Sequence, residues 1–163
     1  MRPRVKISGK RFFVIADFQH LQKLKKAIKV LQGTQGKPQL SILGRLGNDD
    51  FFLDSMEMHL EQELEAYWNE VLKAKTDFGF FINPELGTLF VAGPMASQFL
   101  SDISGEPLGT MAAGPYGILR GLDINEDKVN YYLKLLKDGH YLLFVRTSTQ
   151  QWELIQEQLG KLK

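Results

Sequence analysis

A strand, a helix and a second strand follow one another early in the chain, and this pattern limits the possible folds more than any other feature of the sequence. The segment "RFFVIADF" (residues 11–18) is rich in aromatic and β-branched residues, which predicts a buried strand. Apolar residues then recur at steps of three and four from Gln19 to Gln32, which predicts an amphipathic helix that ends at Gly33. The segment "QLSILGRLG" (residues 39–47) alternates enough to form the second strand. Because right-handed crossovers of this kind join parallel strands, we expect a compact βαβ unit.

The end of the chain predicts a helix, a strand and a final helix. Asn125 is a good N-cap, and Glu126 and Asp127 place negative charge in the first turn. Gly139 follows the last turn of this helix. The apolar run "YLLFV" (residues 141–145) then predicts a strand that is buried on both sides. An apolar stripe marks the final helix and consists of Trp152, Ile155, Leu159 and Leu162.

The middle of the chain begins with a third predicted helix. Asp54 resembles the first residue of a capping box, and an apolar stripe continues from there to about Lys75. Residues 78–94 resemble either two short extended pieces around a Pro/Gly turn or an irregular apolar segment. This part of the chain therefore predicts a long helix followed by a short extended region.

Small residues stand at every fourth position between Gly93 and Gly121, and this spacing lets helix backbones approach closely. Pro107 and Pro115 argue against one continuous helix, because proline removes a backbone donor and clashes with the preceding turn. We therefore expect two short helical pieces in a tight hairpin. This hairpin either packs inside the domain or forms a surface that self-associates or touches a membrane peripherally. The residues expected at such an interface are Gly105, Gly109, Ala113 and Gly117.

These patterns together predict a single α+β domain over residues 1–163. We expect a small ferredoxin-like sheet, built from the first βαβ unit and from the late helix, strand and helix. A helical insertion at residues 48–120 should contain the Gly/Ala-rich hairpin. A chain of 163 residues buries roughly 70% of its unfolded surface, which is enough for a core of this kind.

Missing residues and motifs exclude several classes of function. The chain has no cysteine, so it has no disulfide and no cysteine nucleophile, and without an apolar signal peptide at its start we expect a cytoplasmic protein. No run reaches the ~18 uncharged apolar residues of a membrane span. Phosphate-loop, dinucleotide-glycine, G-x-S-x-G and H-E-x-x-H motifs are absent, so we lean against an enzyme and expect no cofactor. His59 and Glu63 lie four residues apart, but two ligands do not complete a metal site, and we expect no metal.

Charged residues are strongly segregated along the chain, although the net charge is only +1. Residues 1–47 carry a net charge of +10, residues 48–86 carry −8 and residues 87–163 carry −1. The basic third and the acidic block can neutralise one another within a monomer or across a dimer. Alternatively, the basic third forms a nucleic-acid surface, which is the weaker interpretation.

Three segments of the chain carry a resemblance to a known family. They are "INPELGTLFVAGPMA" (residues 82–96), "GTMAAGPYGILRGLDI" (residues 109–124) and "NEDKVNYYLKLLKDGHYLLFV" (residues 125–145). Together they resemble the bacterial general-stress-protein, or heat-induced-stress-protein, domain family. Asn125 stands where that family usually has proline, and His140 replaces the second glycine of its Gly-Gly pair. The resemblance implies a small α+β domain in a stress-linked context, with no established enzymatic activity.

One candidate ligand site lies at the carboxyl end of the first strand, where open α/β sheets tend to bind ligands. Asp17 stands at this end of the strand, and His20 stands at the start of the following helix. Tyr131 should lie near the rim of the core and Tyr132 inside it, so Tyr131 is the exposed aromatic candidate. Simple structural roles also explain these residues, since Asp17 can cap a helix and Tyr131 can keep its hydroxyl in water.

Two classes of function fit these observations. The first is a non-enzymatic, stress-associated interaction module that forms a homo-oligomer or binds a protein partner. The second is a small-ligand-binding domain, with or without catalysis, that uses the sheet end near Asp17 and His20. Nucleic-acid binding through the basic N-terminal third is a weaker alternative.

Overall fold

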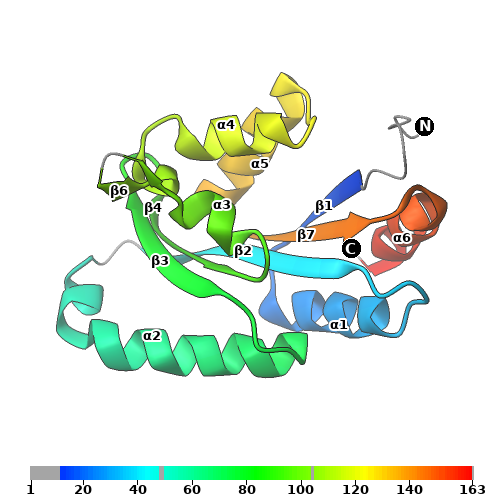
Figure 1. Ribbon diagram of the computed structural model, residues 1–163, viewed down its shortest axis with the longest axis horizontal. Coiled ribbons are helices and arrows are strands. Elements are labelled where there is room, and N and C mark those ends of the chain that lie inside the picture. Colours follow the sequence, from blue (N-terminus) through cyan, green and yellow to red (C-terminus); the bar gives the residue numbers. More distant parts are fainter. Residues whose placement is uncertain (1–11, 48–49, 104, 163) are drawn as a thin grey trace.

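A five-stranded antiparallel sheet runs through the centre of the molecule, with the strands in the order β1, β7, β2, β4 and β3 (Figure 1). This computed structural model describes residues 12–47, 50–103 and 105–162, and for residues 12, 47, 50–60 and 103 it describes the backbone only. The strands of the sheet are β1 (Phe12–Phe18), β2 (Gln39–Gly47), β3 (Phe78–Asn83), β4 (Gly87–Ala92) and β7 (Tyr141–Thr147). In these described residues, a sheet of this kind together with six α-helices confirms the predicted α+β class.

The predicted βαβ unit is present, but its two strands are not neighbours. Helix α1 (Leu21–Gln32) connects β1 to β2, and β7 lies between these strands and pairs antiparallel with both. The strands β1 and β2 therefore run in the same direction without sharing hydrogen bonds. The bounds of β2 are those that the sequence predicts.

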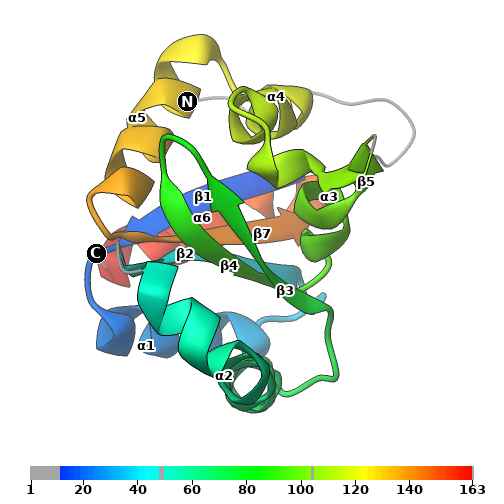
Figure 2. The ribbon, with the colours of Figure 1, turned by 90° about the vertical axis from the view of Figure 1, so that its left-hand side faces the viewer.

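Helices cover both faces of the sheet and divide the interior into two cores (Figure 2). Helices α1, α2 (Asp50–Leu72) and α6 (Thr149–Leu162) pack on one face, and their apolar side chains form the α1-side core. Helices α3 (Ala96–Leu100), α4 (Gly114–Gly121) and α5 (Glu126–Lys137) pack on the other face and form the α5-side core. Ferredoxin-like sheets also place a strand between the two strands of a βαβ unit. Here, however, helices cover both faces of the sheet and make three layers, whereas a sheet with helices on one face has two layers.

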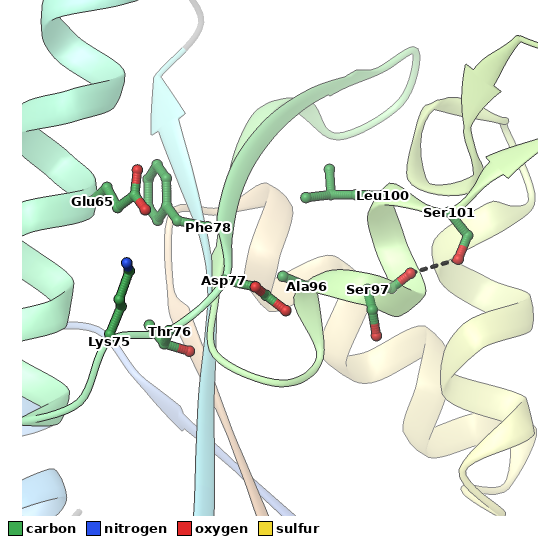
Figure 3. Close-up of a pocket in the computed structure, with 9 residues that line it drawn as sticks. All are labelled: Glu65, Lys75, Thr76, Asp77, Phe78, Ala96, Ser97, Leu100 and Ser101. Atoms are coloured by element: carbon green, nitrogen blue, oxygen red, sulfur yellow. Dashed lines mark hydrogen bonds between the residues drawn. The ribbon is translucent and has the colours of Figure 1, made fainter.

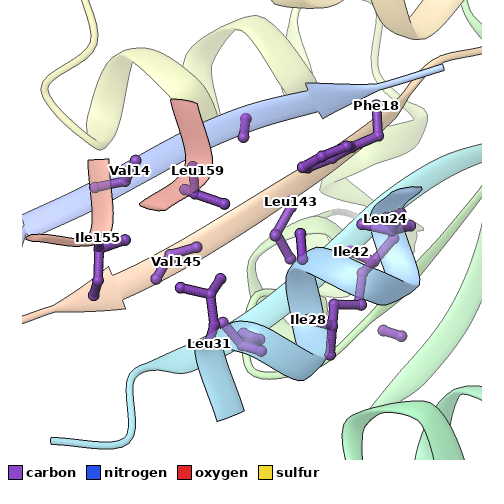
Figure 4. Close-up of a cluster of buried hydrophobic side chains, with 14 of the residues drawn as sticks. Val14, Phe18, Leu24, Ile28, Leu31, Ile42, Leu143, Val145, Ile155 and Leu159 are labelled. Carbon is purple, nitrogen blue, oxygen red and sulfur yellow. The ribbon is translucent and has the colours of Figure 1, made fainter. Parts of the chain in front are cut away.

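Strand β7 shows how the sheet separates the two cores. Leu143 and Val145 point into the α1-side core, where Figure 4 shows them among side chains of α1 and α6. Leu142 and Phe144 point into the α5-side core. All four are at most 1% exposed, because alternate residues of a strand face opposite sides and both sides are covered. The predicted double burial of this strand is therefore confirmed.

Residues 48–120 are less helical than expected, because they also supply two strands of the main sheet. Helix α2 begins at Asp50, so the prediction of a helix start at Asp54 is wrong. The two extended pieces predicted within residues 78–94 are β3 and β4, which pair with each other and attach to β2 through β4. Shorter elements complete the segment, namely β5 (Asp102–Ile103), β6 (Glu106–Pro107) and the 3-10 helix η1 (Leu108–Thr110).

Helix α5 is capped as its sequence predicts. The side chain of Asn125 accepts a hydrogen bond from the backbone N–H of Lys128 at 2.9 Å. Gly139 follows the helix with a φ of 97°, a conformation that glycine adopts without strain. In the described part of the chain, none of the helices has the length and apolar character needed to cross a membrane.

Candidate functional site

The side chains of Asp17 and His140 meet beside the loop that joins α5 to β7. Oδ2 of Asp17 lies 3.3 Å from Nδ1 of His140. Both side chains are largely buried, with 13% of Asp17 and 19% of His140 exposed. Such a carboxylate–imidazole pair can hold and transfer a proton. The two residues are 123 positions apart, so no local pattern in the sequence connects them.

Two tyrosines of α5 lie at the same corner. The hydroxyl of Tyr132 donates a hydrogen bond to the carbonyl of Ile15 at 3.1 Å. Burial, followed by the charge of Asp17 and by the neighbouring Tyr131, raises the pKa of Tyr132 to about 12. The ring of Tyr131 lies 5.6 Å from that of Tyr132 and is 52% exposed. The predicted placement of Tyr131 at the rim and Tyr132 deeper in the core is confirmed.

His20 does not take part in this arrangement. It is the exposed N-cap residue of α1, and its side chain makes no capping hydrogen bond. The structure therefore brings together two of the three residues predicted to bind a ligand, Asp17 and Tyr131, and adds His140 and Tyr132 to them.

The small residues spaced by four do not share one packing role. Gly109 is buried, and a Cβ added there would lie 2.7 Å from the ring of Phe81. Gly105 and Gly117 have open space around the position of a Cβ, and Ala113 and Gly117 are exposed. Gly109 is thus enclosed within its own chain, so the prediction that it lies at an interface is wrong. Gly105, Ala113 and Gly117 remain on the surface.

The glycine that permits the closest backbone approach lies outside the four-residue repeat. A Cβ added at Gly114 would lie 2.0 Å from the carbonyl oxygen of Leu108, far inside van der Waals contact. This contact lets the first turn of α4 press against η1. The backbone-to-backbone contact between α4 and η1 therefore depends on Gly114. Within the repeat, Gly93 also approaches backbone closely, since a Cβ added there would lie 2.5 Å from the carbonyl oxygen of Leu40.

A buried asparagine joins the β3–β4 turn to the segment before α4. Asn83 is 2% exposed, and its amide nitrogen donates to the carbonyls of Gly109 at 2.9 Å and Met111 at 3.0 Å. Its amide oxygen accepts from the backbone N–H groups of Glu85 and Leu86. All four hydrogen bonds that the amide can make are formed, which is what a buried polar group requires. No sequence pattern predicts the role of this residue, and its local signal is the turn sequence Asn-Pro.

A hollow of about 590 Å³ lies against the beginning of β3, between α2 and α3 (Figure 3). Glu65 lines it from α2, Phe78 from β3, and Ser97 and Leu100 from α3. The hydroxyl of Ser101 donates to the carbonyl of Ser97 at 2.6 Å on the same side of the hollow. The hollow therefore opens beside the last strand of the sheet.

The outer edge of β3 pairs with no other strand of the described chain. The carbonyl of Asp77 accepts a hydrogen bond from Gly93, so residue 77 faces β4. Because residues of an antiparallel pair alternate, the backbone groups of Phe78, Phe80 and Ile82 point away from β4. The strand "FGFFIN" carries no charged residue, and Ile82 is 49% exposed. Edge strands without charge or proline are ready to pair with another strand.

Among the described side chains, no ion pairs between α1 and α2 neutralise the basic and acidic segments. Gln32 of α1 donates to the carbonyl of Val71 of α2, and Lys25 lies 5.4 Å from the ring centre of Tyr67. Within residues 12–47, 50–103 and 105–162, however, no ion pair joins a lysine of α1 to an acid of α2. Five of the eleven basic residues of the first third lie in residues 1–11, outside the described part.

The described residues offer no metal centre, and no relative of the chain was found. Among the described residues, no three potential ligands cluster in a way that could hold a metal ion, and the side chain of His59 lies outside the description. No family model matches the chain, and neither a curated protein nor a solved structure is significantly similar to it. The resemblance to the general-stress-protein family therefore stays a prediction.

Proposed function

We propose that the chain is an interaction module that self-associates by pairing the β3 strands of two copies. The observation that supports this proposal is the open, uncharged edge of β3, whose outward backbone groups belong to Phe78, Phe80 and Ile82. Backbone N–H and C=O groups form strong hydrogen bonds, and an added strand satisfies a whole row of them at once. The open edge would then become the middle of a continuous ten-stranded sheet.

A second copy fits this edge because an antiparallel strand pair can be symmetric about a two-fold axis. With the axis at Phe80, Phe78 of one copy lies opposite Ile82 of the other, and each outward residue meets an outward residue. The side chains of these three residues lie on one face of the strand, since they are two positions apart. Ile82, which is 49% exposed, would be covered by Phe78 of the second copy.

The charges that flank β3 fit the same pairing. Lys75 precedes the strand and Glu85 follows it, and both side chains are exposed. The two-fold axis at Phe80 brings Lys75 of one copy toward Glu85 of the other. The hollow between α2 and α3 leaves space beside the beginning of β3, where the second strand would enter.

This proposal places the protein among non-catalytic modules, with the family resemblance suggesting a role in a stress response. The association it describes uses backbone hydrogen bonds and apolar contacts, so it should persist at high salt, unlike an association between the basic and acidic segments.

Light scattering after size-exclusion chromatography tests the proposal through Ile82→Lys. The wild-type protein should have twice the chain mass of 18.6 kDa at micromolar concentration and at both low and high salt. A lysine at residue 82 loses the apolar contact with Phe78 and places a charge at the edge, so the dimer dissociation constant should rise by about tenfold or more, or ~1.4 kcal/mol.

Leu154→Lys is the matched control, because Leu154 is an exposed apolar residue of α6 at 44% exposure and lies far along the chain from β3. Its dimer should dissociate as the wild type does. A wild-type monomer at all concentrations tested, or a dimer that Leu154→Lys weakens as much as Ile82→Lys, would show that β3 is not the interface.

A further inference from the structure

A groove of about 650 Å³ runs between α1 and the carboxyl-terminal part of α2, and its charge is strongly positive. Lys25, Lys26 and Lys29 line it from α1, and Lys73 lines it from the turn after α2. Glu70 is the one acidic residue in the lining. The groove shares no lining residue with the hollow beside β3, so it is independent of the proposed dimer contact.

The positive charge of the groove is offset only in part within the described chain, by Glu70. No acid among the described residues lies within 4.0 Å of any of the four lysine amines. Two backbone carbonyls at the end of α2 already accept other hydrogen bonds, that of Val71 from Gln32 and that of Glu70 from the backbone N–H of Lys73. Four like charges around one groove repel one another, so a bound anion would lower the energy of this surface.

The lining also indicates the class of anion. The four cations are lysines and none is an arginine, which suits the point-charge recognition of phosphate groups better than the paired hydrogen bonds of a carboxylate. Lys25 already lies over the ring of Tyr67 at 5.4 Å, so this face of the ring is not free to stack on a base. The volume is that of a small-molecule site, which typically measures about 300–1,000 Å³.

We infer that this groove binds a small molecule that carries several phosphate groups. Lys26 and Lys29 are exposed and hold the ligand through charge, while Lys25 is half-buried and is held in place by Tyr67. The side chain of Gln22 lines the same groove and supplies an uncharged hydrogen-bond donor. Binding depends on phosphate charge and not on an apolar or aromatic part of the ligand.

Calorimetric titration with sodium tripolyphosphate at low salt tests this inference. Wild-type protein should bind with a stoichiometry of one per chain, and sodium sulfate at the same ionic strength should bind at least tenfold more weakly, because it carries fewer charges on one centre. The double variant Lys26→Gln/Lys29→Gln should raise the dissociation constant by about tenfold or more, since two of four cations are replaced by uncharged polar side chains.

Lys134→Gln/Lys137→Gln is the matched control, because both residues are exposed lysines of α5 on the opposite face of the sheet. This variant should bind tripolyphosphate as the wild type does. Equal weakening in both double variants, or no heat of binding in the wild type, would overturn the inference. An oligothymidylate that binds more tightly than tripolyphosphate, with the same dependence on Lys26 and Lys29, would also overturn it and would make the groove a nucleic-acid surface.

Discussion

The hydroxyl of Tyr132 is held in its neutral form by the surrounding structure. Burial and, to a smaller extent, the charge of the Asp17 carboxylate raise the pKa of this side chain from 10.0 to about 12. The unfolded chain therefore releases this proton at lower pH than the folded chain does. The neutral hydroxyl therefore contributes its full stabilisation of the fold below about pH 10, and this contribution is lost as the pH rises toward 12.

We expect Tyr132→Phe to have two opposite effects on stability. At neutral pH the variant should lose about 1 kcal/mol, because the hydrogen bond to the carbonyl of Ile15 is missing. Above pH 10, a rise in pH should lower the free energy of unfolding of the variant less than that of the wild type. The difference should reach about 2 to 3 kcal/mol, which corresponds to a pKa shift of this size. Urea unfolding followed from neutral to alkaline pH measures both effects.

Tyr131→Phe provides the control for this measurement, since it removes a neighbouring hydroxyl from a ring that is 52% exposed. Most of the loss of stability at alkaline pH should persist in the Tyr131→Phe variant. Tyr141, whose pKa is also raised by burial, contributes to the alkaline loss in all three proteins alike. An alkaline loss in Tyr132→Phe as large as in the wild type would contradict the assignment to Tyr132.

At the scale of elements, the junction of η1 and α4 is a contact that tolerates little change. The first turn of α4 approaches the carbonyl of Leu108 so closely that only glycine fits at residue 114. Three residues further on, Gly117 lies in the same helix with open space around it. Substitutions at these two glycines therefore distinguish the effect of close packing from the effect of having a glycine inside the same helix.

We expect Gly114→Ala to destabilise the protein by about 2 kcal/mol or more, because the new Cβ would collide with backbone that cannot move aside. Gly117→Ala should instead stabilise it by about 0.5 to 1 kcal/mol, the usual difference between glycine and alanine inside a helix. Thermal and urea unfolding of the two variants measure the difference. Equal and small effects of both substitutions would mean that α4 does not press against η1 in this way.

At the scale of the whole molecule, one sheet couples two separate cores. Both tryptophans of the chain, Trp68 and Trp152, belong to the α1-side core. Phe99 lies in the α5-side core, where its ring stacks on Phe81 at 5.6 Å and meets Phe144 at 6.4 Å. Because β7 contributes fully buried side chains to both cores, loss of one core should expose the other.

We expect Phe99→Leu to lower the free energy of unfolding by about 1 to 2 kcal/mol, through lost contact area and ring stacking. Tryptophan fluorescence and far-ultraviolet circular dichroism should show the same shifted midpoint in urea, although Phe99 lies across the sheet from both tryptophans. Phe90→Leu, which removes a ring stacked on Trp68 at 5.4 Å, is the matched change in the other core. A fluorescence midpoint that Phe99→Leu leaves unchanged would show that the two cores unfold separately.

Local sequence patterns were sufficient for most helices and strands. The ends of β2 and the N-cap of α5 follow from alternation, capping residues and glycine, all of which act within a few residues. The beginning of α2 differs from the predicted start at Asp54, because residues 50–53 contain no helix breaker and the helix extends one turn further. The small-residue repeat does not predict the close approach at Gly114, since spacing alone does not show which glycine another segment approaches.

The α+β class, the order of elements along the chain and the burial of β7 on both sides follow from short-range periodicity, because each strand and helix must hide its own apolar face. The position of β7 between β1 and β2, the open edge of β3, the pairing of Asp17 with His140 and the groove between α1 and α2 depend on contacts between residues far apart in the chain. Those contacts arise only when the layers pack together, since many strand orders satisfy the same local pattern. The surfaces on which both functional proposals depend were therefore decided by tertiary packing.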